Sequence, residues 1–171
     1  MPDHMLGAAG STVVGSDVFI AHSVWCLAMS AAQPTVFTRI INGDIPGTFV
    51  WRDERAVAFM SINPITAGHT LVVPVEEVEH WVHVDPTLMA HLFDVTRWIG
   101  AAHERAFPCE RVGVIIAGYE VPHTHIHVFP TNSMADYSFA NAAPHVERDD
   151  LDAWAGAIRS ELTALGAPGV V

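Results

Sequence analysis

The chain has 171 residues, of which 50% are hydrophobic, and a formal net charge of −11 at pH 7. This length allows one domain with a hydrophobic core, and the acidic charge argues against general binding to nucleic acid backbones or anionic membranes, which requires basic patches. Cys26 and Cys109 lie too far apart for a paired metal motif or a disulfide framework, so the expected setting is the reducing cytoplasm.

Residues 1–35 are expected to form a poorly ordered N-terminal extension. They contain no lysine or arginine, and their apolar run over 18–32 is interrupted by His22 and Ser23. Because this run lacks the basic flank of a secretory signal, it predicts neither export nor a membrane span. A short helix over about 18–31 that docks on the body is the alternative.

A folded domain is expected over 36–145. Phe37 and Ile40 have helical spacing in a short turn, which ends at the glycine and proline of 43–46. Runs of β-forming residues then predict strands over 48–51, 55–60 and 69–74, with a polar turn at 52–54 between the first two.

One long helix is predicted to begin at Asp85 and Pro86, because an acidic N-cap followed by proline is a strong start signal. Phe93 and Trp98 fall off the main apolar stripe of this helix, which indicates a second buried face against a partner subunit. The stripe itself has three- and four-residue spacing and consists of Leu88, Leu92, Val95, Ile99, Ala102 and Ala106.

Three histidines alternate with other residues in the segment 121–130, which follows a predicted strand over 112–117 and pairs with it as a hairpin. In a strand, His123, His125 and His127 stand in one row, while Thr124, Ile126 and Val128 face the core. Prolines at 122 and 130 are expected to end the ladder at both sides.

Such a row of imidazoles suggests two kinds of chemistry. One imidazole can attack a phosphorus centre while its neighbours donate hydrogen bonds to the phosphate oxygens. The row can instead bind a metal ion, although no carboxylate or cysteine lies beside it at ligand spacing. A polar outer face on a half-exposed strand is the non-functional interpretation.

A C-terminal helix and tail are predicted over 146–171, after a polar loop at 131–143. Asp149 and Asp150 can cap this helix, which keeps apolar residues at helical spacing as far as Gly166. The predicted fold class is therefore α+β, with an antiparallel sheet of about five strands on which the long helix and the C-terminal helix pack.

The segment 123–129 resembles the His-x-His-x-His motif of the histidine triad (HIT) family, with Thr124 as a mild departure. The segment 36–46 is similar to the opening of that family, and 58–64 with 68–74 to its second block. The resemblance covers about 36–139 and implies a HIT-like fold, a homodimer and a nucleotide hydrolase or nucleotidyl transferase acting at the α-phosphate of a purine nucleotide conjugate.

The resemblance also implies catalytic roles for four histidines. His125 would attack the phosphorus and form a covalent nucleotidyl-histidine, and a backbone carbonyl is expected to hold its other ring nitrogen. His123 and His127 would donate to phosphate oxygens and help to protonate the leaving group. His69 would have a supporting role at the edge of the site.

By the same resemblance, Phe37, Ile40, Phe59 and Ile62 would line the base and the ribose, although core packing also explains these side chains. Ser61 occupies the place of the ribose-binding acid of many members, and Asn63 can substitute for it. Gly118 lies in the segment 117–122, which replaces the phosphate loop of the family. That segment contains Glu120, whose carboxylate would repel a nearby α-phosphate.

Substrates of the kind expected are dinucleoside polyphosphates or phosphoramidates of adenosine or guanosine. No cofactor and no protein-bound metal are expected, and a divalent cation would enter only as a counter-ion of the substrate. The alternative is a protein that keeps the fold and binds a nucleotide or a metal without turnover.

Overall fold

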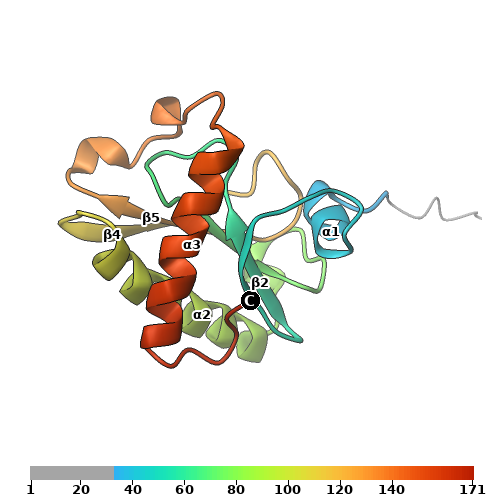
Figure 1. The fold of residues 1–171 in the computed structure, drawn as a ribbon. Coiled ribbons are helices and arrows are strands. Elements are labelled where there is room, and N and C mark those ends of the chain that lie inside the picture. Colours follow the sequence, from blue (N-terminus) through green and yellow to red (C-terminus); the bar gives the residue numbers. More distant parts are fainter. Residues whose placement is uncertain (1–32) are drawn as a thin grey trace, which may run out of the picture. The chain divides into compact units, whose positions relative to one another are not determined.

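A computed structural model describes residues 33–171 (Figure 1), which form one compact unit. The predicted low order of the N-terminal extension and the alternative helix over 18–31 lie outside the described residues. Thr35, which the sequence assigned to the extension, belongs to the folded body because it is buried and caps the first helix. The folded body therefore begins slightly earlier than predicted.

The described elements confirm an α+β fold with a five-stranded sheet in the order β1-β2-β3-β5-β4, in which all neighbours are antiparallel. The helices are α1 (Val36–Ile41), α2 (Pro86–Ala106) and α3 (Arg148–Ala164). The strands are β1 (Phe49–Arg52), β2 (Ala56–Met60), β3 (Thr70–Pro74), β4 (Arg111–Ile115) and β5 (Ile126–Thr131). Short 3-10 turns lie at Trp81–His83, Met134–Asp136 and Phe139–Asn141.

Each face of the sheet has its own cluster of buried apolar side chains. Helices α2 and α3 pack side by side on one face (Figure 1), where they cover Val72, Ile126 and Val128. Phe37 of α1 packs with Phe59 and other side chains of the opposite face. The prediction that Ile126 and Val128 face the core is confirmed, since neither is exposed.

Helix α2 follows the sequence prediction closely. The Asp85 carboxylate accepts hydrogen bonds from the backbone N–H groups of Thr87 and Leu88, at 2.9 and 3.3 Å. The predicted stripe is buried from Leu88 to Ala102. Phe93 is 47% exposed and Trp98 packs partly against the core, so the partner-facing role of Phe93 stays a prediction.

The histidine segment differs from the prediction of one regular strand. Strand β5 begins only at Ile126, so His123 and His125 precede the ladder and the three rings do not form a single row. Pro130 lies inside β5, opposite Val112 of β4. Within a strand, the nitrogen and the carbonyl of one residue point to the same side. The Pro130 carbonyl points towards β3, whose pairing with β5 has already ended at Val128, so the missing N–H of the proline breaks no hydrogen bond of the sheet.

The C-terminal helix begins earlier than the predicted cap. Its N-cap is Glu147, and Asp149 and Asp150 lie in its first turn, where negative charge favours the helix dipole. The helix ends before Gly166, whose φ of 74° suits a residue without a side chain. None of the helices within 33–171 combines the length and the apolar content needed to cross a membrane.

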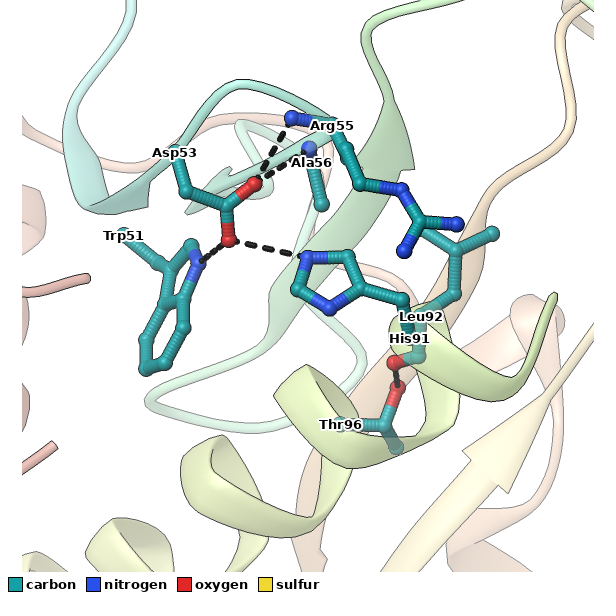
Figure 2. A network of polar contacts seen from close by, with 7 residues as sticks. All are labelled: Trp51, Asp53, Arg55, Ala56, His91, Leu92 and Thr96. Carbon is teal, nitrogen blue, oxygen red and sulfur yellow. Dashed lines mark hydrogen bonds and ion pairs between the residues drawn. The ribbon is translucent and has the colours of Figure 1, made fainter. Parts of the chain in front are cut away.

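Asp53 closes the predicted polar turn between β1 and β2 and ties it to α2 (Figure 2). One carboxylate oxygen accepts from the backbone N–H groups of Arg55 and Ala56, at 2.8 and 2.9 Å. The other lies 2.7 Å from Trp51 Nε1 and 2.9 Å from His91 Nε2. Burial by itself raises the pKa of Asp53, but these hydrogen bonds lower it overall, so the ionised carboxylate is the form that fits.

Candidate active site

A cavity of about 470 Å³ contains most of the predicted site residues. This volume is in the usual range for small-molecule sites. His69, His125 and His127 supply its polar wall, Phe37 and Phe59 part of its apolar wall, and the segment 139–151 closes one side. The cavity is thus built from α1, β2, β3, β5 and the region after β5.

His125 has the orientation that a nucleophile needs. Its Nδ1 lies 2.7 Å from the carbonyl oxygen of His123, which can only accept, so Nδ1 carries the proton. This finding confirms the predicted backbone carbonyl beside His125. The lone pair of the neutral ring therefore lies on Nε2, and burial lowers the pKa of His125, which favours the neutral form.

His69 and His127 form a short chain of hydrogen bonds next to His125. The backbone N–H of Ile65 donates to His69 Nδ1 at 3.0 Å, so a neutral His69 carries its proton on Nε2. That Nε2 lies 3.0 Å from His127 Nδ1 and donates to it. A neutral His127 must then carry its proton on Nε2, which makes this nitrogen a hydrogen-bond donor.

His123 lies behind the cavity wall, and its predicted contact with phosphate stays a prediction. It is fully buried and does not line the cavity. Its Nε2 lies 2.9 Å from the carbonyl oxygen of Pro74, and its Nδ1 lies 3.0 Å from Thr35 Oγ1. Both nitrogens are engaged by the protein because His123 precedes the strand and its ring turns away from the row.

Because several buried histidines are neutral in the folded chain, we expect the chain to lose stability in acid. Burial lowers the pKa of His69 to about 3 and those of His103 and His127 to about 4, while unfolded histidine titrates near 6.5. As pH falls below about 6.5 the unfolded chain binds protons first, so each group lowers the free energy of unfolding by up to about 1.4 kcal/mol per pH unit. The stabilisation is complete above pH 6.5 and is lost towards pH 3 to 4.

Urea unfolding at pH 7.5, 6.0 and 5.0 checks this dependence. His103 is the most informative single position, because it lies on α2, has an unpartnered Nδ1 and does not line the cavity. His103→Leu is expected to make the pH dependence shallower. An unfolding free energy that stays constant between pH 7.5 and 5.0 in the parent chain would contradict the interpretation.

The predicted nucleotide-binding residues fall into two groups. Phe37, Ile40, Phe59 and Ile62 all line the cavity; Phe37 and Phe59 are also core residues, whereas Ile62 is 70% exposed. The rings of Phe37 and His125 meet edge to face, with centroids 4.9 Å apart. The apolar wall therefore reaches the ring of His125.

The remaining residues predicted to bind the nucleotide do not all line the cavity. Ser61 lines the cavity, and so does Asn63, but the Asn63 amide nitrogen donates to the carbonyls of Ala143 and Pro144. Gly118 does not line the cavity; its φ of 76° marks a turn. Glu120 does line it, and its charge is close enough to act on the pKa of His125.

Several lining residues after β5 were missed by the sequence analysis. Phe139 packs edge to face on His127 with centroids 4.9 Å apart, and Arg148 lies on the wall while pairing with Asp152 at 3.1 Å. The backbone N–H of Ala143 donates to the Pro64 carbonyl, which holds this segment on the loop after β2. No motif marks Phe139 or Arg148, because their positions follow from the folding of an irregular loop.

The ring nitrogens of the histidines are engaged mainly by hydrogen bonds within the protein. Within 33–171, no group of three or more His, Cys, Asp or Glu side chains has a geometry that could hold a metal ion. The hydrogen bonds of His69, His123 and His125 to protein groups instead fix which ring nitrogens carry protons. The arrangement suits an uncharged nucleophile next to a hydrogen-bond donor.

Residues 42–134 match the family model of the HIT domain, which is more than half of the chain. The chain belongs to the HIT family. This HIT domain lies inside the predicted range of 36–145, and the whole segment 139–151 lies outside the matched region.

Relatives of this HIT protein include an uncharacterized HIT-like protein from Borreliella burgdorferi, 37% identical over 102 residues that cover 56% of this chain and 73% of the relative. An asymmetrical bis(5'-nucleosyl)-tetraphosphatase from Schizosaccharomyces pombe is 31% identical over 93 residues, 52% of this chain and half of that enzyme. The family thus has members that hydrolyse nucleotides.

A solved structure from Sulfolobus tokodaii, described as a hypothetical histidine triad nucleotide-binding protein, shares the fold with a TM-score of 0.67. It is 26% identical, and the match covers 75% of this chain and 92% of that one. The agreement extends beyond the triad to the antiparallel sheet with helices packed on it.

Proposed function

We propose that this HIT protein is a nucleotide hydrolase or nucleotidyl transferase that acts at the α-phosphate of a purine nucleotide conjugate. The observation that carries the proposal is the hydrogen bond from His125 Nδ1 to the His123 carbonyl, which leaves the Nε2 lone pair of a cavity residue available. The tetraphosphatase among the relatives supports the same class of reaction.

The first step forms a bond between His125 Nε2 and the α-phosphorus while the bond from phosphorus to the leaving group breaks. The leaving group takes its proton from Nε2 of His127 in the imidazolium form, which the negative charge of the bound phosphate favours, and His127 is left as a neutral ring next to His69. In the second step a water oxygen attacks the phosphorus, His127 takes up a proton from it, and the bond to His125 breaks. The product is a nucleoside monophosphate, or a nucleotidylated acceptor when an alcohol or amine replaces water.

Charge around the cavity favours one kind of conjugate. Glu120 is the one carboxylate, and Arg148 the one Lys or Arg, among the described lining residues, and Arg148 is already paired with Asp152. A polyphosphate tail would find little positive charge to offset its own and would be repelled by Glu120. An uncharged amine leaving group needs no positive partner and is not repelled. We therefore place phosphoramidates ahead of dinucleoside polyphosphates as substrates.

The proposal includes a homodimer and a cytoplasmic location. Phe93, half exposed on α2, would face a second copy of the chain in a homodimer. The cysteine usage fits a cytoplasmic protein. A binding protein without turnover is the competing function, and the presence of Glu120 in the cavity lining is the observation that favours it.

Turnover of an adenosine or guanosine phosphoramidate by the purified full chain tests the proposed function. We expect release of the nucleoside monophosphate without added metal, and faster cleavage of the phosphoramidate than of a dinucleoside tetraphosphate at equal concentration. Thermal stabilisation by adenosine or guanosine monophosphate with no cleavage of either substrate would instead support the binding protein.

A further inference from the structure

A chain of hydrogen bonds connects an exposed carboxylate to the buried side of the histidine triad. Glu77, just after β3, accepts a hydrogen bond from the Thr35 backbone N–H at 3.0 Å, and the same carboxylate oxygen lies 3.1 Å from Thr35 Oγ1. The same oxygen accepts from Thr38 Oγ1. Thr35 Oγ1 in turn lies 3.0 Å from His123 Nδ1.

The proton positions along this chain can be assigned. His123 Nε2 faces the Pro74 carbonyl and must donate, so Nδ1 of the neutral ring accepts from the Thr35 hydroxyl. The Thr38 hydroxyl and the Thr35 backbone N–H then satisfy Glu77. Every donor has an acceptor, and the ring of His123 is held at both nitrogens.

Two routes lead from this chain to the proposed nucleophile. The first passes through His123, whose backbone carbonyl accepts from His125 Nδ1 at 2.7 Å and so fixes the tautomer of that ring. The second passes through the first turn of α1, which Thr35 caps and which carries Phe37 against the edge of His125. Among residues 33–171, the hydrogen bonds of the Glu77 carboxylate go to Thr35 and Thr38, and Glu77 itself does not line the cavity.

We propose that Glu77 is a positioning residue of the HIT site: through Thr35 it holds His123 and the start of α1, and thereby orients His125. The expected loss of kcat rests on the proposed function, whereas the expected change in the histidine tautomers can be measured without turnover. No feature of the sequence marks Glu77, because Thr35, Glu77 and His123 are far apart along the chain and meet only in the fold.

Kinetics of matched variants provide the first test. Glu77→Ala is expected to lower kcat for the phosphoramidate between about tenfold and a hundredfold, because small displacements of a reacting group cost that much. KM should change less, since most of the cavity wall is untouched. Glu77→Gln keeps an acceptor oxygen and should recover part of the loss, whereas Glu79→Ala removes a nearby exposed carboxylate and should match the parent chain.

A double-mutant cycle tests the route through Thr35. Thr35→Val removes the hydroxyl while keeping the side-chain shape, and Glu77→Ala should cost clearly less in that background than in the parent. Thermal unfolding of each variant shows whether a loss of kcat reflects unfolding. Equal kcat values for Glu77→Ala and Glu79→Ala, or effects of Glu77 and Thr35 that simply add, would overturn the proposal.

Side-chain ¹⁵N NMR of the histidines tests the proposal even if no substrate is turned over. The parent chain should have the proton of His123 on Nε2 and that of His125 on Nδ1. Glu77→Ala should move both signals towards averaged tautomers, and Glu79→Ala should leave them unchanged. Unchanged tautomers in Glu77→Ala would contradict the positioning role, whereas absent turnover with the expected shifts would contradict only the proposed function.

Discussion

His125→Ala is expected to lower turnover of a nucleoside phosphoramidate by at least about 10⁴-fold, because the variant lacks the atom that forms the intermediate. The loss should appear in kcat, since Phe37, Phe59 and the rest of the wall remain to bind the nucleotide. Single-turnover kinetics with enzyme in excess measures this effect without interference from product release.

His83→Ala is the matched control for His125→Ala. His83 is exposed, lies in the 3-10 turn Trp81–His83 and does not line the cavity. Its activity and thermal stability should equal those of the parent chain. A His125→Ala variant that keeps more than about a hundredth of the parent activity would mean that another group, or water directly, attacks the phosphorus.

His127→Ala is expected to cost about 10²- to 10⁴-fold when the leaving group is a basic amine or an alcohol. The reason is that Nε2–H of His127 is the donor that the hydrogen bond with His69 holds in place. A leaving group that needs no proton, such as a nitrophenolate, should show a much smaller loss. His125→Ala, in contrast, should be equally damaging with both kinds of substrate.

This dependence on the leaving group separates proton donation from a general loss of structure. The loss of rate caused by His127→Ala should be clearly larger with an alkyl phosphoramidate than with a nitrophenyl ester of the same nucleotide. The same factor for both substrates would show that His127 only shapes the cavity. His69→Ala should follow the pattern of His127→Ala with smaller losses, because His69 acts through His127.

Local signals explain why the sequence predicted so much of the fold. The Asp85 cap and the spacing of the apolar stripe define α2, because both depend on residues within a few positions of one another. The same holds for the five strands, whose bounds differ from the predictions by a few residues. The largest error concerns His123, where a turn that only the fold determines delays the start of β5 to Ile126.

Much of the candidate site depends on contacts between distant parts of the chain, which no local pattern reveals. The backbone carbonyl beside His125 could be predicted, since chemistry requires a defined tautomer there. The use of Asn63 to hold the segment 143–144, and the packing of Phe139 on His127, depend on how an irregular loop returns to the cavity. The contact of Thr35 with His123 could not be predicted either, because the two residues are far apart along the chain.

Detection of the covalent intermediate tests the central claim most directly. The full chain is mixed with a nucleoside phosphoramidate, denatured within the first turnover at mildly alkaline pH to preserve the phosphorus–nitrogen bond, and analysed by intact-protein and peptide mass spectrometry. We predict the added mass of one nucleotidyl group on His125 in the parent chain and none in His125→Ala. Nucleoside monophosphate released without any adduct, or an adduct on another side chain, would contradict the account.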